Sequence, residues 1–95
     1  MDELKLRYPH GLEPVYTNRL MIWHSETEVV VDAFVVTQGQ PETSIRARLV
    51  MSPETAKSLW SALGQNIAQY ERQYGIVHVP GDMTLANNLF GDEED

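Results

Sequence analysis

The three histidines are the first residues to test for chemistry, because imidazole is a common metal ligand and general base. His10, His24 and His78 stand alone, with no second histidine at a metal-ligand interval and no H-E-x-x-H motif. The chain has no cysteine, which excludes disulfides, thiol catalysis and thiolate metal sites. The six glycines form no phosphate-binding loop, and no serine has the context of a nucleophile elbow. The sequence therefore predicts no catalytic residue, no metal and no cofactor.

Asp32 and Arg48 are opposite charges that the sequence places on neighbouring strands. Residues 28–37 (EVVVDAFVVT) and 44–51 (SIRARLVM) have strand composition, and a Gly and Pro loop joins them. If residue 32 lies opposite residue 48, the apolar rows of the two strands align and the two charges meet. We expect a cross-strand salt bridge. A polar site formed by the same two residues on the sheet is the alternative.

Two asparagines inside predicted elements are candidate polar structural residues. Asn18 follows Tyr16 and Thr17 at the opening of a first strand predicted over residues 15–25, and Asn66 lies in the middle of a predicted helix. Asparagine is a mediocre helix former, so its side chain in such a place is expected to bond to something specific. We predict that each caps a turn or fixes strand register, with contact to a bound peptide as the alternative.

The helix predicted over residues 52–75 has a start, a stripe and a stop. Ser52 is a preferred N-cap, Pro53 suits the first helical position, and Glu54 lies at the favourable end of the helix dipole. Gly75 can take the left-handed conformation that ends a helix. Apolar residues recur between them at helical spacing, namely Ala56, Leu59, Trp60, Leu63, Ile67, Tyr70 and Tyr74. This stripe needs an apolar partner.

These elements predict an α+β fold, a three-stranded antiparallel meander followed by one long helix packed on the sheet. We expect a single sheet-helix domain over residues 15–79, a flexible N-terminal arm over residues 1–14 and an acidic, disordered tail over residues 80–95. The arm has two prolines, one glycine and no sustained periodicity. The helix stripe is expected to cover one face of the sheet.

The second strand is apolar on both faces, so one helix does not cover all of it. The face that carries Val30, Phe34 and Val36 is left over, and a chain of this size buries only about 60–65% of its unfolded surface. We predict a homo-oligomer, most simply a two-fold dimer. The alternative is that the arm, or the segment after Gly75, folds back over this face.

The charge balance argues against nucleic acid as a partner. Of the formal net charge of −7, the last four residues, 92–95, supply four, which leaves −3 for the rest. Phosphate-backbone binding relies on a concentrated basic surface. No run approaches the ~18 apolar residues of a membrane span, and no signal peptide is recognisable, so a cytoplasmic location is expected.

The tail has a second feature, an apolar cluster ahead of its acidic end. The cluster consists of Met83, Leu85, Leu89 and Phe90, of which Leu85, Leu89 and Phe90 are the candidate contact residues. The pattern is typical of short segments that become ordered on a protein partner, although a solvated tail is the alternative.

Three stretches, VYTNRLMI, EVVVDAFV and IRARLVMSPETAKSLWSALGQNIAQYERQYG, resemble the DUF3467 family of small prokaryotic proteins. The matching motifs are Tyr16 with Asn18, Asp32, Arg48 with residues 51–53, and Asn66, Ile67, Tyr70, Glu71 and Gly75. The resemblance spans residues 15–76, implies the same fold and implies no established activity. A weaker analogy, of architecture only, is to SecB-type export chaperones.

We therefore expect a non-enzymatic, oligomeric protein-interaction module of the adaptor type. One alternative is a SecB-like chaperone that binds peptides on the face around Val30, Phe34 and Val36 or at an open sheet edge. The other is a small-ligand protein or enzyme whose site, around Asp32, Arg46, Arg48 and His24, forms only across an oligomer interface.

Overall fold

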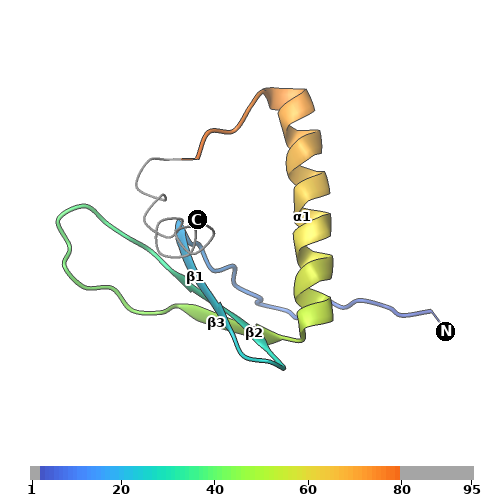
Figure 1. The fold of residues 1–95 in the computed structure, drawn as a ribbon, viewed down its shortest axis with the longest axis horizontal. Helices are drawn as coiled ribbons and strands as arrows, with labels where there is room; N and C mark the ends of the chain where they lie inside the picture. Colours follow the sequence, from blue (N-terminus) through green and yellow to red (C-terminus); the bar gives the residue numbers. More distant parts are fainter. Residues whose placement is uncertain (1–2, 80–95) are drawn as a thin grey trace.

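The computed structural model describes residues 3–79, which form three strands followed by one helix (Figure 1). The elements are β1 (Arg19–His24), β2 (Val29–Phe34), β3 (Ala47–Met51) and α1 (Pro53–Tyr74). The strands are antiparallel in the order β1-β2-β3, so β2 is the central strand. The predicted α+β fold, a three-stranded meander followed by one long helix, is confirmed.

The strand register is the one that the charge pattern predicts. Asp32 on β2 lies opposite Arg48 on β3, and Val31 lies between Ile22 and Leu49. Because side chains alternate along a strand, a slip of one residue would move every side chain to the opposite face. The register therefore also fixes which apolar residues share a face.

Each strand is shorter than its predicted range, because the outer residues use other hydrogen bonds. At the start of β1, the Thr17 hydroxyl donates to the carbonyl of Phe34 at 2.7 Å. At the start of β3, the Arg46 amide still donates to the carbonyl of Ala33 at 2.8 Å, outside the assigned strand. The ends of the predicted strands thus lie close together without forming a regular ladder.

The two faces of the sheet differ in character. One face contains Val30 and Asp32 on β2, which are only 6% and 4% exposed. The other face, called the apolar sheet face here, consists of Leu20, Ile22, Val31 and Leu49. Its three outer-strand members are about half exposed, between 45% and 57%. The core of the single chain is therefore small and lies on the Val30 side.

The helix begins as predicted. Ser52 has extended dihedrals, φ −72° and ψ 160°, and its Oγ accepts a hydrogen bond from the amide of Thr55 at 3.2 Å. Pro53 follows as the first helical residue, where its missing N–H leaves no broken bond.

The helix ends at Gly75, but not in the predicted left-handed helical conformation. The φ of Gly75 is +106° and its ψ is 169°, a region that essentially only glycine adopts. Its amide donates to the carbonyl of Glu71 at 2.9 Å. Glycine is needed here to redirect the chain out of the helix.

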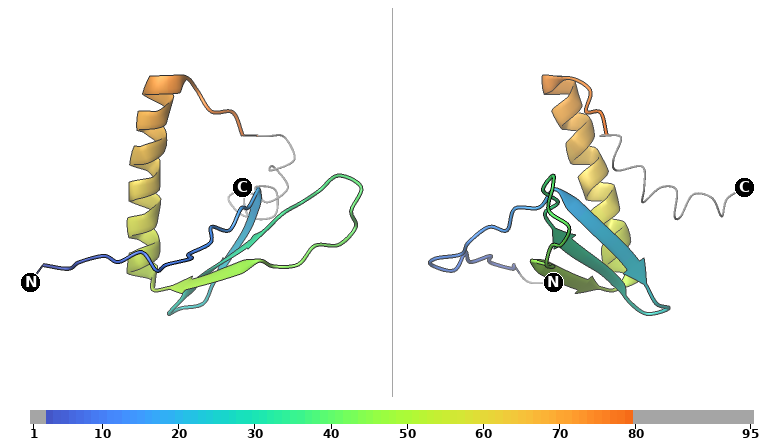
Figure 2. Two further views of the ribbon diagram at one scale, coloured as in Figure 1. Left: turned by 180° about the vertical axis from the view of Figure 1, so that it is seen from behind. Right: turned by 90° about the vertical axis from the view of Figure 1, so that its left-hand side faces the viewer.

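The helix does not cover its own sheet. Ser52 is the single residue between β3 and α1, whereas two to six residues usually join a strand to a helix in α/β units. So short a link gives α1 little room to turn back. It meets the sheet chiefly at β3 and stands apart from it beyond the junction (Figures 1 and 2). No residue of α1 is buried, so the expected cover of the sheet by the stripe is missing in the single chain.

The residues before β1 include the predicted N-terminal arm, and those after α1 lead into the predicted tail. Residues 3–17 form no strand or helix, and Leu4, Leu6 and Tyr8 are more than three-quarters exposed. The acidic tail predicted over residues 80–95 lies outside the described residues.

The N-cap gives a direct test of the helix boundary. We predict that Ser52→Ala lowers the free energy of unfolding by about 0.5–2 kcal/mol, because the Thr55 amide loses its acceptor. Ser58→Ala, an exposed change within the same helix, serves as the control and is expected to leave stability unchanged or slightly higher. Urea unfolding of both variants measures the difference, and equal stabilities would place the helix start elsewhere.

Candidate functional site

Asp32 is the centre of a small polar cluster on the Val30 face of the sheet. Its two carboxylate oxygens accept from Arg48, from Nε at 2.7 Å and from the terminal guanidinium nitrogen at 2.9 Å. The indole nitrogen of Trp23 donates to Asp32 Oδ2 at 3.4 Å, and the Arg48 guanidinium carbon lies 5.5 Å from the Trp23 ring centroid. We call these three residues the Asp32 cluster. The predicted cross-strand salt bridge is confirmed.

The Asp32 cluster holds its carboxylate in the charged form. Hydrogen bonding from Arg48 lowers the pKa of the Asp32 carboxyl below its ordinary value, and the Trp23 indole acts in the same direction. Burial of the carboxyl opposes this shift, because a charged group loses water there. Both carboxylate oxygens already have donors, and the residue is only 4% exposed. The arrangement suits a structural ion pair better than a ligand site.

The alternative polar site, with Arg46 and His24 added, is not assembled in the single chain. His24 lies opposite Val29, whereas Asp32 lies opposite Met21, so the imidazole and the carboxylate are on opposite faces of the sheet. Arg46 precedes β3, and its amide bonds to the carbonyl of Ala33. The four residues therefore do not form one site within a single chain, and a site that forms across an oligomer interface stays a prediction.

Asn18 fixes the register at the start of β1, as one of its predicted roles required. Its side-chain Oδ1 accepts from the amide of Val36 at 2.8 Å, and its Nδ2 donates to the carbonyl of the same residue at 3.0 Å. The amide side chain thus copies the paired bonds of a neighbouring strand residue. It extends the pairing between the two segments past the end of β2.

Asn66 acts differently from the prediction. Its Nδ2 donates to the carbonyl of Ala62, one turn earlier in α1, at 3.2 Å. It therefore bonds within its own helix, neither capping a turn nor fixing strand register. Asn66 also lines an open groove on the helix.

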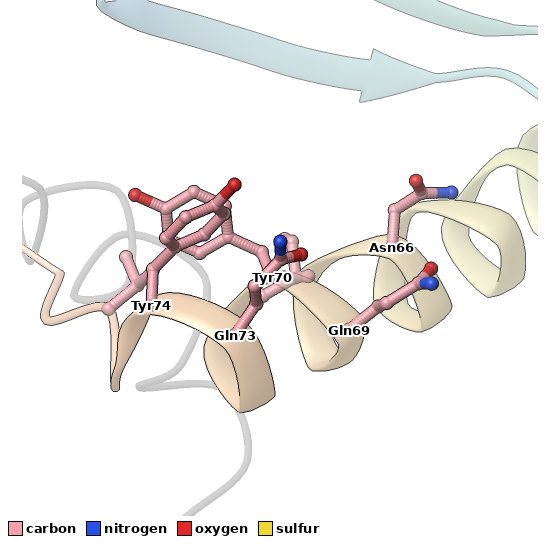
Figure 3. A pocket seen from close by; sticks show the side chains of 7 residues that line it. Asn66, Gln69, Tyr70, Gln73 and Tyr74 are labelled. Atoms are coloured by element: carbon pink, nitrogen blue, oxygen red, sulfur yellow. The ribbon is translucent and has the colours of Figure 1, made fainter.

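That groove has a volume of about 610 Å³ and follows the C-terminal half of α1 (Figure 3). Figure 3 shows Asn66, Tyr70 and Tyr74 projecting from the helix toward the side on which β1 lies. The two tyrosine rings are 4.9 Å apart and tilted by 51°. Its lining residues are Asn66, Ile67, Gln69, Tyr70, Gln73, Tyr74 and Val77. The groove is open, so it suits an extended partner surface better than an enclosed small molecule.

Glu71 has a structural role that sequence reasoning missed. Its carboxylate accepts from the amide of Val77 at 2.9 Å, while its carbonyl accepts from the amide of Gly75. Both bonds hold the segment after the helix against the last turn. The sequence signal for this role is that an acidic residue lies four positions before Gly75, the glycine that ends the helix.

The candidate contact residues fall into three groups. Val30 is buried at 6% exposure between its cross-strand neighbours Trp23 and Val50, so it does not belong to the free surface of the single chain. Phe34 is half-buried and Val36 is 39% exposed. The tail residues of this set, Leu85, Leu89 and Phe90, lie outside the described residues.

Residues 3–79 contain neither a metal-binding cluster of side chains nor a helix suited to span a membrane. No three His, Asp or Glu side chains in this range gather as a possible metal-binding group. No helix in the same range has the length and hydropathy that a membrane span requires.

The comparisons with known proteins identify a family. A family model described as "Protein of unknown function (DUF3467)" matches residues 4–79, which is most of the chain, so the chain belongs to the DUF3467 family. The match confirms the resemblance seen over residues 15–76 and extends it into the N-terminal arm. No curated protein and no solved structure matches the chain.

The Asn18 bonds predict a measurable loss of stability. We expect Asn18→Ala to lower the free energy of unfolding by about 1–3 kcal/mol, because two hydrogen bonds worth about 0.5–1.5 kcal/mol each disappear. Asn18→Asp keeps an acceptor for the Val36 amide and is expected to lose less. Chemical unfolding of the three proteins gives the order, and an unchanged Asn18→Ala variant would contradict the assigned role.

The Asp32 pKa predicts how stability depends on pH. Because the folded pKa lies below the unfolded value of about 3.9, the unfolded state binds more protons as the pH falls. The contribution of the ion pair is thus present above about pH 4 and is lost as the pH falls through the folded pKa.

We predict that the difference in Tm between the natural chain and Asp32→Asn narrows as the pH is lowered from about 6 to about 2. Glu26→Gln, at an exposed position, is the control for general carboxylate titration and is expected to follow the natural chain. A Tm difference that stays constant over this range would show that the charge of Asp32 does not stabilise the fold.

Proposed function

We propose that this member of the DUF3467 family is a non-enzymatic, oligomeric protein-interaction module of the adaptor type that works in the cytoplasm. The observation that supports the proposal is the uncovered apolar stripe of α1. Its larger side chains, called the helix stripe below, are Leu59, Trp60, Leu63, Ile67, Tyr70 and Tyr74, and each is between 44% and 71% exposed.

The exposure of the helix stripe is costly if nothing covers it. Complete burial of one Leu, Ile or Phe side chain is worth about 1.5–3 kcal/mol relative to exposure. Monomeric proteins rarely expose contiguous apolar patches beyond a few hundred Å², and larger patches mark interaction sites. A row of six such side chains along one helix face therefore supports binding to another protein surface.

The polar residues singled out by the sequence support the same proposal. Asn18, Asp32, Arg48 and Asn66 each bond to groups of their own chain. These side chains therefore use their donors and acceptors mainly for hydrogen bonds within the chain. The surface that remains for recognition is apolar and aromatic, with groove-lining amides at its edge.

We propose the tail as a second contact region. Leu85, Leu89 and Phe90 lie within 20 residues of the end of α1 and precede four acidic residues. A segment of this composition suits a partner with an apolar groove and a basic rim.

Peptide binding in the manner of a chaperone is the second candidate. It is favoured by the sheet topology, because β1 and β3 each pair on one side only with β2. An extended peptide can add to such an open edge through main-chain hydrogen bonds. This function predicts many weakly bound clients in place of one defined partner.

A capture experiment from the native host separates these functions. The four baits are the full chain, a chain ending at Val79, the stripe variant Leu63→Asp with Ile67→Asp, and the control Ser61→Asp with Gln65→Asp. The control changes exposed residues on the opposite side of the same helix. Circular dichroism first establishes that all four baits retain their helix.

We predict one stoichiometric protein with the full chain and the control, and its loss with the stripe variant. If the chain ending at Val79 also fails to capture this protein, the tail supplies a further part of the contact. Many substoichiometric clients, together with suppression of aggregation of an unfolded model protein, would contradict the adaptor function in favour of the chaperone. Capture of nothing by any bait would contradict both.

A further inference from the structure

We propose that two copies of the chain pair so that the helix stripe of each packs on the apolar sheet face of the other. The inference rests on the proposed function in treating the helix stripe as an interaction surface. It identifies a second copy as the occupant of the helix stripe and names the surface on that copy that receives the helix. The partner protein of the adaptor then binds the assembled dimer, and the stripe variant loses that partner because the dimer does not form.

Both halves of such an interface are present and open in one chain. The helix stripe runs from Leu59 to Tyr74, which is about 22 Å at 1.5 Å per residue. The strands of the apolar sheet face have five or six residues, or about 17–20 Å at 3.3 Å per residue. The two apolar surfaces therefore match in length.

The same chain does not bring its own two surfaces together. Ser52 alone separates β3 from α1, and the helix stands apart from the sheet beyond that junction (Figure 2). The stripe residues and the outer members of the apolar sheet face remain about half exposed or more. A helix supplied by a second copy is free of the short link and can lie along this sheet.

The chemistry of the two surfaces also agrees. The helix stripe and the four residues of the apolar sheet face carry no charge, and the ionisable side chain on the same side of the sheet, His24, lies at the end of β1, so pairing the two surfaces need not bury an unpaired charge. The tail of the same chain fits less well, because its last four residues are all acidic. Its larger apolar residues, Met83, Leu85, Leu89 and Phe90, are too few to cover both surfaces, whereas a second copy covers both.

The exposed area of the chain is large enough for this interface. The chain exposes 9038 Å², whereas a folded monomer of 10.8 kDa exposes only about 5,500 Å² according to the scaling of surface with mass. The difference is roughly 3,500 Å², while each partner of a standard interface buries about 800 Å². About 800 Å² of this difference is enough for one side of a standard interface, even though extended segments contribute to the rest.

Reciprocal packing has a simple symmetry. If the helix of one copy covers the sheet of the other, the same contact occurs twice about a two-fold axis, and the assembly closes as a dimer. No open surface of the same kind is left for further copies to add. The exchange of an identical element between protomers is a low-cost route to such dimers.

Cysteine cross-linking tests the arrangement, because the natural chain contains no cysteine. Each variant is a full chain with one substitution. The helix variants are Leu59→Cys, Leu63→Cys and Ile67→Cys, and the sheet variants are Ile22→Cys and Leu49→Cys. A disulfide requires Cα atoms within about 7 Å, so only residues in contact will join under mild oxidation. Helix and sheet variants are mixed in pairs after partial unfolding and refolding, to exchange copies.

We predict a disulfide-linked species of dimer mass in at least one helix and sheet mixture, and none when either variant is oxidised alone. Gln65→Cys, on the opposite side of α1, is the matched control and is expected to give no linkage with either sheet variant. A chain carrying both Leu63→Cys and Ile22→Cys distinguishes linkage between copies, at dimer mass, from linkage within one chain, at monomer mass.

Three results would overturn the inference. Linkage within one chain would show that the helix folds back on its own sheet. Linkage of a helix variant with itself would show that the two helices pair with each other. Absence of linkage in every mixture would exclude the contact. None of these results decides the adaptor function, because the capture experiment measures binding to a different protein.

Discussion

The connection between β3 and α1 is the constraint on which the rest of the structure depends. Ser52 must serve as the only linking residue and as the N-cap of the helix at the same time. Its Oγ bonds to Thr55, and Pro53 starts the helix at once. The helix therefore leaves the sheet directly, and its apolar side finds no cover within residues 3–79.

The sheet is held in register by polar contacts more than by a large core. Asp32 bonds to Arg48 across β2 and β3, and Trp23 of β1 donates to the same carboxylate, so one side chain ties together all three strands. Asn18 continues the pairing beyond the end of β2. This register places Leu20, Ile22 and Leu49 on one face. The bonds that define the fold thus also assemble the apolar surface that a partner would cover.

Much of this structure follows from the sequence, because the decisive signals are local. Ser52 and Pro53 fix the start of the helix, and the alternation around Asp32 and Arg48 fixes the register of β2 and β3. The contact of Trp23 with Asp32 depends on how an indole lies across a neighbouring strand, which strand alternation does not specify. The separation of helix and sheet depends on the direction in which α1 leaves Ser52, and an apolar stripe shows only that a partner is needed. The burial of Val30 was missed for a related reason, since it results from its neighbours Trp23 and Val50.

One chain leaves the helix stripe and the apolar sheet face uncovered, and in the proposed dimer a second copy covers them. The most direct test is the mass of the full chain in solution, measured by light scattering across a wide concentration range together with the Tm. A dimer has twice the chain mass of 10.8 kDa and a Tm that rises with concentration, because association stabilises the folded state. A mass of 10.8 kDa at every concentration, with cooperative unfolding at a constant Tm, would contradict it.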